Sequence, residues 1–339
     1  MSETRTRVEF IDQISRDRLW SDLERFVQYD RLSGTDGDHN AADFIAERLQ
    51  EFGVPVQVYE HQAYLSYPRR SNLELLRPEP RGFNTLTHSF SPTTSPEGVV
   101  GELIAVGTGR PEDYLGIDVT GKIVLIDQLA TPERAIVAEV KGAKAAVFVS
   151  QERVIHNMTM TTVWGTPSPE QADRLPRMPG VSVVKSDGDH LRRLLTEGPV
   201  TVRVVAETWI GWKTLKLPIV DIEGSVEDTF LLVAGHYDSW HYGATDNGTG
   251  DVCLMELARV LWNNRELLRR GVRIAWWSGH SHGRYAGSAW YADRFWEDLD
   301  DRCVGLLNID NPGCRPSTST KYRYCRLYPT AVRGCRGIK

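Results

Sequence analysis

Toward the C-terminus of this sequence, short apolar segments alternate with a helical segment, and polar residues directly follow each apolar segment. Residues 229–234, 273–277 and 304–309 have the length and apolar content of buried strands, and residues 250–264 have helical periodicity. Strands that alternate with helices favour a mostly parallel sheet covered on both faces. We therefore predict an α/β fold, with its ligand-binding residues beyond the carboxyl ends of these strands.

Four polar clusters occupy the positions where such a sheet binds ligands. Three directly follow the predicted strands: Gly-His-Tyr-Asp-Ser at 235–239, Ser-Gly-His-Ser-His at 278–282 and Asn-Ile-Asp-Asn at 308–311. The fourth cluster, Gly-Ala-Thr-Asp-Asn-Gly-Thr-Gly at 243–250, lies on the loop before the helix. We expect all four to converge at one edge of the sheet.

Three side chains of these clusters form a candidate metal-ligand set. His236 offers an imidazole nitrogen, whereas Asp246 and Asp310 offer carboxylate oxygens. This mixture suits zinc with an open coordination position. The glycines around Asp246 let the backbone turn sharply, so its carboxylate can approach an ion. Each signal is weak alone, because a histidine beside an aspartate is more often a hydrogen-bonded pair and Asp-Asn-Gly is ordinary turn chemistry.

Taken together, the segments LLVAGHYDSW, GATDNGTGDVCLMELAR, RIAWWSGHSHGRYAGSAWYAD and GLLNIDNPG resemble the zinc aminopeptidase and glutamate carboxypeptidase family. The resemblance covers most of residues 212–313, and the loop RLSGT at 31–35 also resembles the opening segment of that family. It implies a three-layer, mostly parallel sheet of the zinc exopeptidase type, with one or two zinc ions as cofactor.

The resemblance also implies roles for individual residues. His236, Asp246 and Asp310 match the ligands of the first zinc, and Asp246 matches the carboxylate that bridges to the second. Asp238 matches the acid that orients the metal-bound imidazole, as such histidines usually require.

One pair of residues departs from the family pattern. In the family, two adjacent glutamates follow the strand predicted here at 273–277; the first is the general base and the second ligates the second zinc. The matching positions are His280 and Ser281. His280 can accept a proton, and His280 or His282 can alternatively bind a metal, whereas serine is a poor ligand. The competing interpretation is a loop that forms hydrogen bonds without catalysing.

Two helices are predicted near the N-terminus. From Val8 to Val27 the apolar residues recur at roughly helical spacing, which indicates one or two amphipathic helices. Another helix is expected to be capped by Asp38 and to end at Gly53.

A separate domain is predicted in the middle of the chain. The composition around residues 78–96 turns to Pro, Ser, Thr and Asn, as at a crossing between domains. Beyond it, short strands, two short helices and the phrase GKIVLID…KGAKAAVFVS resemble a protease-associated domain. We expect residues 95–207 to be a β-rich α+β insertion in a peptidase domain formed by residues 1–94 and 208–313.

Composition and charge narrow the class of partner. The net charge of -5 and pI near 6.0 provide no basic field for nucleic acid or an anionic membrane. The sequence shows neither a signal-peptide apolar region nor a membrane-spanning apolar run. We therefore expect a cytoplasmic protein with a peptide or amide substrate.

The last 26 residues differ from the rest, with seven Lys or Arg, no acid and three of the five cysteines. The family pattern continues past the Asp310 motif with further elements and a late histidine, but we find no resemblance after Gly313. Residues 314–339 are therefore expected to be an aberrant tail of frameshift type that ends a truncated protein. Exposed edges would then favour association, and a homodimer is one form of it. The alternative is a basic tail that binds an acidic partner.

Three functions fit these observations unequally. The first is a metal-dependent, aminopeptidase-like exopeptidase that uses a zinc-activated water, impaired where the two glutamates are replaced. The second is a non-catalytic pseudopeptidase or binding protein of the same fold, as the transferrin-receptor ectodomain is in the wider family. The one-zinc glutaminyl cyclases share the fold but fit less well, because this chain keeps the bridging acid and neither the later glutamate nor the late histidine. A nucleotide site is not indicated, because the glycines at 248–250 lack phosphate-loop spacing.

Overall fold

The computed structural model describes residues 10–151, 153–313 and 325–329 of the 339-residue chain. The chain divides into two compact units. Unit 1 comprises Met1–Ala63, Lys213–His280 and Tyr285–Lys339, and unit 2 comprises Tyr64–Trp212 and Ser281–Arg284. Two long strands, β1 (Gln57–Arg77) and β8 (Thr201–Ile222), contribute residues to both units. Unit 2 is therefore larger than the predicted insertion at 95–207, and the predicted domain borders stay predictions.

The sheet of unit 1 is parallel at its centre. Its strands, besides the C-terminal part of β8, are β9 (Glu227–His236), β10 (Arg270–Trp277), β11 (Cys303–Ile309) and β12 (Cys325–Pro329). The order is β12–β11–β9–β10–β8, and β1 also pairs with β8; β9 pairs in parallel with β10 and β11, whereas β8 is antiparallel to β10 and β12 is antiparallel to β11. The register sets Trp277 opposite His236, so the polar residues that follow these strands share one edge.

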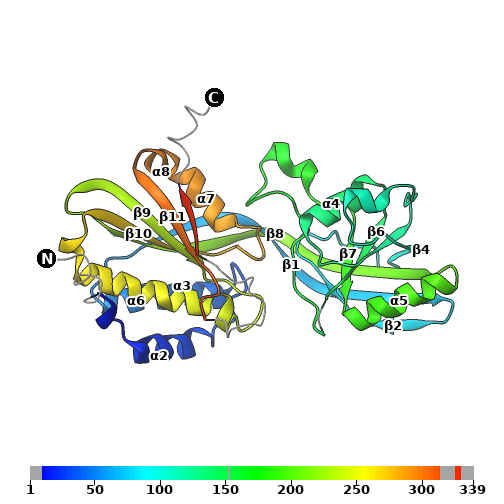
Figure 1. The fold of residues 1–339 in the computed structure, drawn as a ribbon, viewed down its shortest axis with the longest axis horizontal. Coiled ribbons are helices and arrows are strands. Elements are labelled where there is room, and N and C mark those ends of the chain that lie inside the picture. Colours follow the sequence, from blue (N-terminus) through cyan, green and yellow to red (C-terminus); the bar gives the residue numbers. More distant parts are fainter. Residues whose placement is uncertain (1–9, 152, 314–324, 330–339) are drawn as a thin grey trace. The chain divides into compact units, whose positions relative to one another are not determined.

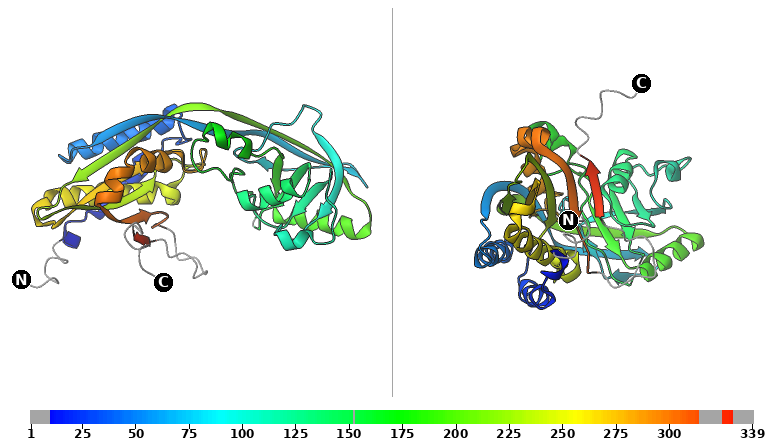
Figure 2. Two further views of the ribbon diagram at one scale, coloured as in Figure 1. Left: turned by 90° about the horizontal axis from the view of Figure 1, so that it is seen from above. Right: turned by 60° about the vertical axis from the view of Figure 1, so that its left-hand side comes forward.

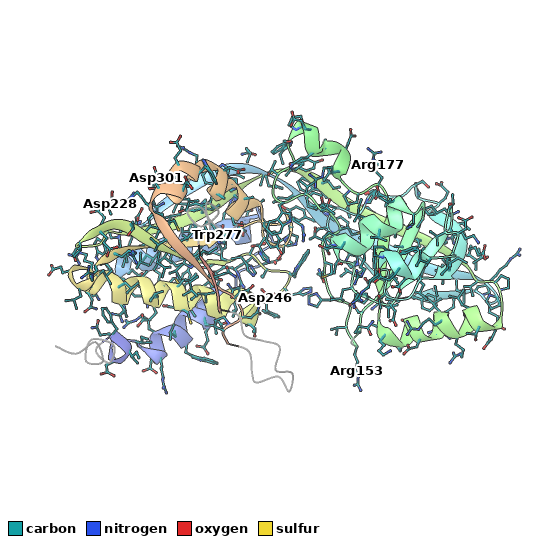
Figure 3. The ribbon with its side chains drawn as sticks, turned by 45° about the horizontal axis from the view of Figure 1, so that its top comes forward. Arg153, Arg177, Asp228, Asp246, Trp277 and Asp301 are labelled. Atoms are coloured by element: carbon teal, nitrogen blue, oxygen red, sulfur yellow. The ribbon has the colours of Figure 1, made fainter. Side chains whose placement is uncertain are left out.

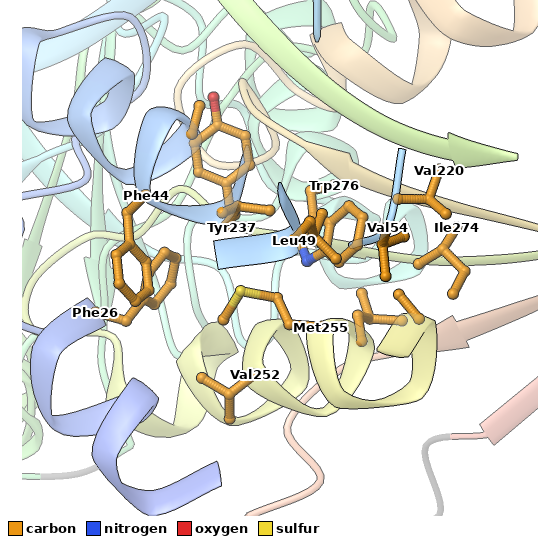
Figure 4. Packing of buried hydrophobic residues seen from close by; sticks show 14 of the residues in the cluster. Phe26, Phe44, Leu49, Val54, Val220, Tyr237, Val252, Met255, Ile274 and Trp276 are labelled. Atoms are coloured by element: carbon orange, nitrogen blue, oxygen red, sulfur yellow. The ribbon is translucent and has the colours of Figure 1, made fainter. Parts of the chain in front are cut away.

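Helices cover both faces of this sheet (Figures 1 and 2). On one face lie α2 (Arg16–Phe26), α3 (Asp36–Glu51) and α6 (Thr249–Asn263), and on the other lie α7 (Ala286–Arg294) and α8 (Trp296–Arg302). Alternation along β10 explains this arrangement: Ile274 and Trp276 join the core beneath α3 and α6 (Figure 4), whereas Trp277 packs on Tyr291 of α7. The predicted three-layer α/β architecture is confirmed.

The start of α3 differs from the prediction. The helix begins at Asp36 with Thr35 as its N-cap residue, so Asp38 lies within the first turn and the expectation that it caps the helix is wrong. Its carboxylate instead accepts hydrogen bonds from the backbone of Gly34 and from the hydroxyl of Ser278 on unit 1. The other end agrees with the prediction, because Gly53 has the positive φ of 72° that terminates a helix.

Unit 2 is rich in strands. Its strands, besides its parts of β1 and β8, are β2 (Arg81–Phe83), β3 (Leu86–Thr87), β4 (Val99–Ala105), β5 (Ile123–Ile126), β6 (Ala145–Val149) and β7 (Gly180–Val183). Its helices are α4 (Pro132–Val140), α5 (Lys185–Glu197) and the short 3-10 turns η1 (Pro111–Tyr114) and η2 (Pro169–Arg174). Strands β4 to β7 are parallel to one another, with one buried cluster on the α4 face and another on the α5 face. The predicted β-rich insertion with two short helices thus has its counterpart here.

The predicted tail falls largely on residues outside the described part of the chain. Within 314–339 the structure describes residues 325–329, which form β12. Among the helices of the described residues, none combines the length and apolar content required to cross a bilayer.

His61 provides a test of how this core responds to acid. Its ring is buried, neither ring nitrogen has a hydrogen-bond partner, and it stacks on Trp290 with centroids 4.5 Å apart. Burial lowers the pKa of His61 from 6.5 to about 4. Between these values the unfolded chain binds a proton that the folded chain does not, so stability falls as the pH decreases through this window.

We expect His61→Phe to make this decline shallower, by at most about 1.4 kcal/mol per pH unit, because phenylalanine keeps the ring stack without the proton. Chemical denaturation from pH 8 to pH 4.5 would measure it. The comparison at pH 8, where His61 is neutral in both states, reports any packing change alone. Parallel stability curves for the two proteins would contradict the prediction.

Candidate metal centre

Three side chains at one edge of the unit 1 sheet converge on a small volume. His236 ends β9, Asp246 lies in η3 (Ala244–Gly248) just before α6, and Asp310 follows β11 (Figure 3 labels Asp246). His236 Nε2 lies 2.9 Å from Asp246 Oδ1 and 3.6 Å from Asp310 Oδ1. One ligand atom of each residue lies within 4.8 Å of the others. The structure therefore brings together the three residues that the sequence suggested as ligands.

Asn247 joins the two loops that carry the carboxylates. Its side-chain amide donates to the carbonyl of Ile309 at 2.9 Å and accepts from the backbone N–H of Asn311 at 3.0 Å. A Cβ at Gly250 would lie 2.3 Å from Asn247 Oδ1, so glycine is needed for this close approach. The Asp-Asn-Gly segment, which by sequence is an ordinary turn, thus links η3 to the end of β11.

Asp238 orients the imidazole of His236. The Nδ1 atom of His236 lies 3.0 Å from the carbonyl oxygen of Asp238 and 3.6 Å from its Oδ1. Because a carbonyl only accepts, Nδ1 donates to it, and Nε2, which faces Asp246 and Asp310, is the nitrogen that can bind an ion once its proton is displaced. The carboxylate of Asp238 is itself held by the hydroxyl of Ser33 at 2.7 Å and the backbone N–H of His280 at 3.2 Å.

The donor set fits a divalent cation. His236 is 4% exposed, and its Nε2 faces the carboxylate of Asp246 at 2.9 Å and that of Asp310 at 3.6 Å. Burial opposes a charged ring, but the carboxylates of Asp238, Asp246 and Asp310 outweigh burial and raise the pKa of His236 well above its usual value. A site that favours positive charge this strongly, and that offers one nitrogen and two carboxylates, suits zinc.

His280 lies directly on the ligand histidine. Its ring stacks on that of His236 with centroids 3.9 Å apart and planes 7° apart, and its other neighbour is Tyr285 at 4.7 Å. Burial, and then the charge of His236, lower the pKa of His280 to about 4. Imidazole lone pairs lie in the ring plane, so an ion in the plane of His236 lies outside the plane of His280. In this conformation His280 is a neighbour of the ligand set and not a fourth ligand of the same ion.

The two residues that follow His280 in the polar segment 278–282 belong to the other compact unit. Ser281 and His282 belong to unit 2, where the ring of His282 meets that of Tyr67 at 5.5 Å. Among the described residues, the single group of three or more potential metal ligands contains neither His280 nor His282.

The N-terminal loop supplies residues that the sequence reasoning did not assign to the site. The hydroxyl of Ser33 donates a hydrogen bond to the carboxylate of Asp238, and the carboxylate of Asp38 accepts one from the hydroxyl of Ser278. Arg31 donates from its Nε to the carbonyl of Tyr237 at 2.7 Å. The sequence did contain one signal for these residues, because the segment RLSGT at 31–35 resembles the opening segment of the family. That resemblance did not indicate which residues of the site they contact.

Comparisons with known proteins agree with this geometry. The model of Peptidase family M28 matches residues 219–324, and the PA domain model matches residues 98–191. Residues 219–324, which include all three clustered residues, are therefore similar to Peptidase family M28, and residues 98–191 are similar to a PA domain. The predicted resemblance is confirmed, although the family match continues to residue 324, which corrects the expectation that it ends at Gly313.

The curated relatives are peptidases by name. The chain is 24% identical over 355 residues to the probable glutamate carboxypeptidase VP8 of Zea mays, covering 86% of this chain and 49% of that protein. It is 28% identical over 288 residues to the aminopeptidase YwaD of Bacillus subtilis, covering 84% of this chain and 58% of that protein. The chain thus spans about half the length of the curated relatives it matches.

Solved structures share the fold. An aminopeptidase from Aneurinibacillus sp. strain AM-1 superposes with a TM-score of 0.68 at 23% identity, covering 88% of this chain and 71% of that one. A zinc aminopeptidase from Bacillus subtilis superposes with a TM-score of 0.61 at 23% identity, covering 87% and 69%.

Zinc should stabilise the protein through the three clustered side chains. Binding to the folded state adds about 2.7 kcal/mol at a ligand concentration about 100 times Kd. We expect zinc to raise the Tm of the chain, and His236→Ala or Asp310→Asn to remove most of that shift in differential scanning calorimetry. Asp301→Asn is a matched control, because this exposed carboxylate on α8 lies outside the cluster (Figure 3). A full shift in His236→Ala would place the metal elsewhere.

Proposed function

We propose that this chain is a zinc-dependent exopeptidase of the aminopeptidase type, which removes residues from the end of a peptide or related amide. The observation that carries the proposal is the convergence of His236, Asp246 and Asp310, with ligand atoms within 4.8 Å of one another. The Peptidase M28 match over these residues and relatives named aminopeptidase and glutamate carboxypeptidase support it.

In this proposal, three side chains bind the ion and a fourth orients one of them. His236, Asp246 and Asp310 hold the ion, and Asp238 keeps His236 in the tautomer that leaves Nε2 free. Bound zinc supplies a Lewis acid that polarises the scissile carbonyl and activates water. The side chain of Asp246 is 55% exposed, so the cluster is open to substrate on that side.

His280 takes the place of the carboxylate base in this proposal. It is the ionisable side chain that stacks on His236, and its half-buried ring offers a nitrogen that can accept a proton from the attacking water. A single imidazole at this place makes a slower peptidase than a glutamate, because the ring plane is held parallel to His236 and is not aimed at the ion.

The first test is turnover. Purified chain loaded with zinc should release p-nitroaniline from aminoacyl p-nitroanilides, and a chelator should abolish the release because the ion is essential. His236→Ala should reduce kcat/KM by about a thousandfold or more, since the loss removes both metal binding and the electrostatic stabilisation that the ion provides. Asp301→Asn is again the control. Zinc-loaded, folded protein without turnover on any aminoacyl or short peptide substrate would contradict the proposal.

His280 decides between an active variant and a non-catalytic one. If its imidazole accepts the proton, His280→Ala should lower kcat by about a hundredfold or more with a smaller change in KM. His280→Glu should retain or raise kcat, because a carboxylate at this position can play the same part. Steady-state kinetics on one substrate measure both variants.

The alternative function is a non-catalytic binding protein of the same fold. The observation that favours it is the face-to-face stack of His280 on His236, which directs neither nitrogen of His280 at the ligand set. In that case the chain binds zinc without turnover, and His280→Ala changes nothing measurable. A gain of activity in His280→Glu from an inactive wild type would establish this alternative.

A further inference from the structure

Arg31 is a buried cation that bonds to backbone at three separate places in unit 1. It is 0% exposed. Its guanidinium donates from Nε to the carbonyl of Tyr237 at 2.7 Å and from Nη2 to the carbonyl of Gly243 at 2.9 Å. Its Nη1 donates to the neighbouring carbonyls of Phe26 at 3.3 Å and Tyr29 at 3.5 Å. The group also lies over the ring of Phe26, 4.5 Å from its centroid.

Two of these four carbonyls, those of Tyr237 and Gly243, belong to the segments that carry the metal ligands. Tyr237 stands between His236 and Asp238 in the chain. Gly243 opens the loop into η3, which carries Asp246. The backbone of Arg31 adds a further tie, because its own carbonyl accepts from the N–H of Ser239 at 2.8 Å. One side chain thus joins the end of β9 to the start of the Asp246 loop.

The Asp246 loop is shaped to fit the guanidinium. Gly243 has a φ of 54°, in the left-handed region that favours glycine. A Cβ there would lie 2.5 Å from Arg31 Nη2 and 2.7 Å from the carbonyl oxygen of Asp246. The nearest atom to such a Cβ is Ser239 Cβ at 2.4 Å, so a side chain at this position is excluded by Ser239 and Asp246 as well as by Arg31.

Burying this guanidinium carries a desolvation cost. Among the described residues, no carboxylate oxygen lies within 4.0 Å of its nitrogens, so its bonds are to neutral carbonyls. Burial lowers the pKa of Arg31, which the more distant Asp251 and Asp238 partly offset. A planar fork with several donors reaches carbonyls in different directions at once, which an ammonium cannot do. The geometry of the carbonyls therefore calls for arginine specifically.

We propose that Arg31 is a positioning residue of the metal centre, holding the His236 and Asp246 segments at the separation that a single ion requires. This inference rests on the proposed zinc site. Residues that orient metal ligands from outside the ligand set commonly change metal affinity by about 10- to 100-fold when replaced. Arg31 differs from the usual orienting acid in acting through backbone carbonyls of two ligand segments.

The test compares Arg31 with a second buried arginine of the same unit. Arg273 is 6% exposed and bonds to Asp221, Asp298 and Tyr291. It lies four residues before Trp277 on β10, about 13 Å along the strand from the partner of His236. Arg31→Met and Arg273→Met each remove a buried guanidinium and should each lower the Tm of the metal-free chain. Only Arg31→Met should affect the metal.

Two measurements on the full chain separate positioning from general destabilisation. We expect Arg31→Met to raise the zinc Kd about 10- to 100-fold in competition with a chromophoric chelator. We also expect it to change the visible absorption spectrum of the Co²⁺-loaded chain, which reports ligand geometry. Arg273→Met should keep the wild-type Kd and spectrum. Wild-type Kd and spectrum in folded Arg31→Met would overturn the inference.

If Arg31→Met does not fold, the same two measurements on Arg31→Lys test the inference. Lysine retains the charge but reaches fewer of the four carbonyls, so its zinc Kd should also rise and its Co²⁺ spectrum should also change. An unchanged Kd in Arg31→Lys would then overturn the inference. A wild-type chain that binds no zinc at all overturns the proposed function itself, which is a different outcome from normal binding in the variants.

Discussion

The parallel pairing of β9 with β10 and β11 is the constraint on which the rest of this structure depends. The register that places Trp277 opposite His236 also brings the ends of three strands to one edge, where the polar segments that follow them meet. Apolar contacts hold this register, because Ile274 and Trp276 pack beneath α3 and α6. A slip by one residue would turn such side chains to the wrong face of the sheet. The core and the metal centre are therefore specified by the same hydrogen-bond ladder.

A metal centre at the end of a buried sheet requires polar groups in a dry environment, and the N-terminal loop supplies their partners. Asp38 shows the balance: burial and the neighbouring Asp238 raise its pKa well above the usual value, while hydrogen bonds from Gly34 and Ser278 act in the opposite direction. The hydroxyl of Ser33 likewise donates a hydrogen bond to the buried carboxylate of Asp238. A loop more than two hundred residues away in sequence is thus part of the site, since each buried carboxylate without a donor would destabilise the fold.

Much of this could be predicted from the sequence where the pattern is local. The central strands and the three clustered ligands follow from apolar segments that end in polar residues. The contacts of Arg31 and Asn247 could not be predicted in the same way, because they are made by backbone groups whose positions exist only after the sheet has formed. Asp38 shows the limit clearly: its local context favours a helix cap, and tertiary hydrogen bonds from Ser278 determine its actual partners. The lengths of β1 and β8 were also missed, because both strands pass from one unit into the other.

The stack of His280 on His236 constrains what the replaced glutamate position can do. A carboxylate is flexible and can aim its oxygens at an ion, whereas an imidazole held 3.9 Å above another ring offers its lone pair only in a parallel plane. To receive a proton from water near the ion, His280 must use the edge of its ring that extends beyond His236. Tyr285 packs edge-to-face against the same ring and limits its rotation. The chemistry open to this site is therefore set by the orientation of His280 as much as by its basicity, and the clustering of His236, Asp246 and Asp310 does not depend on which function the stacked pair serves.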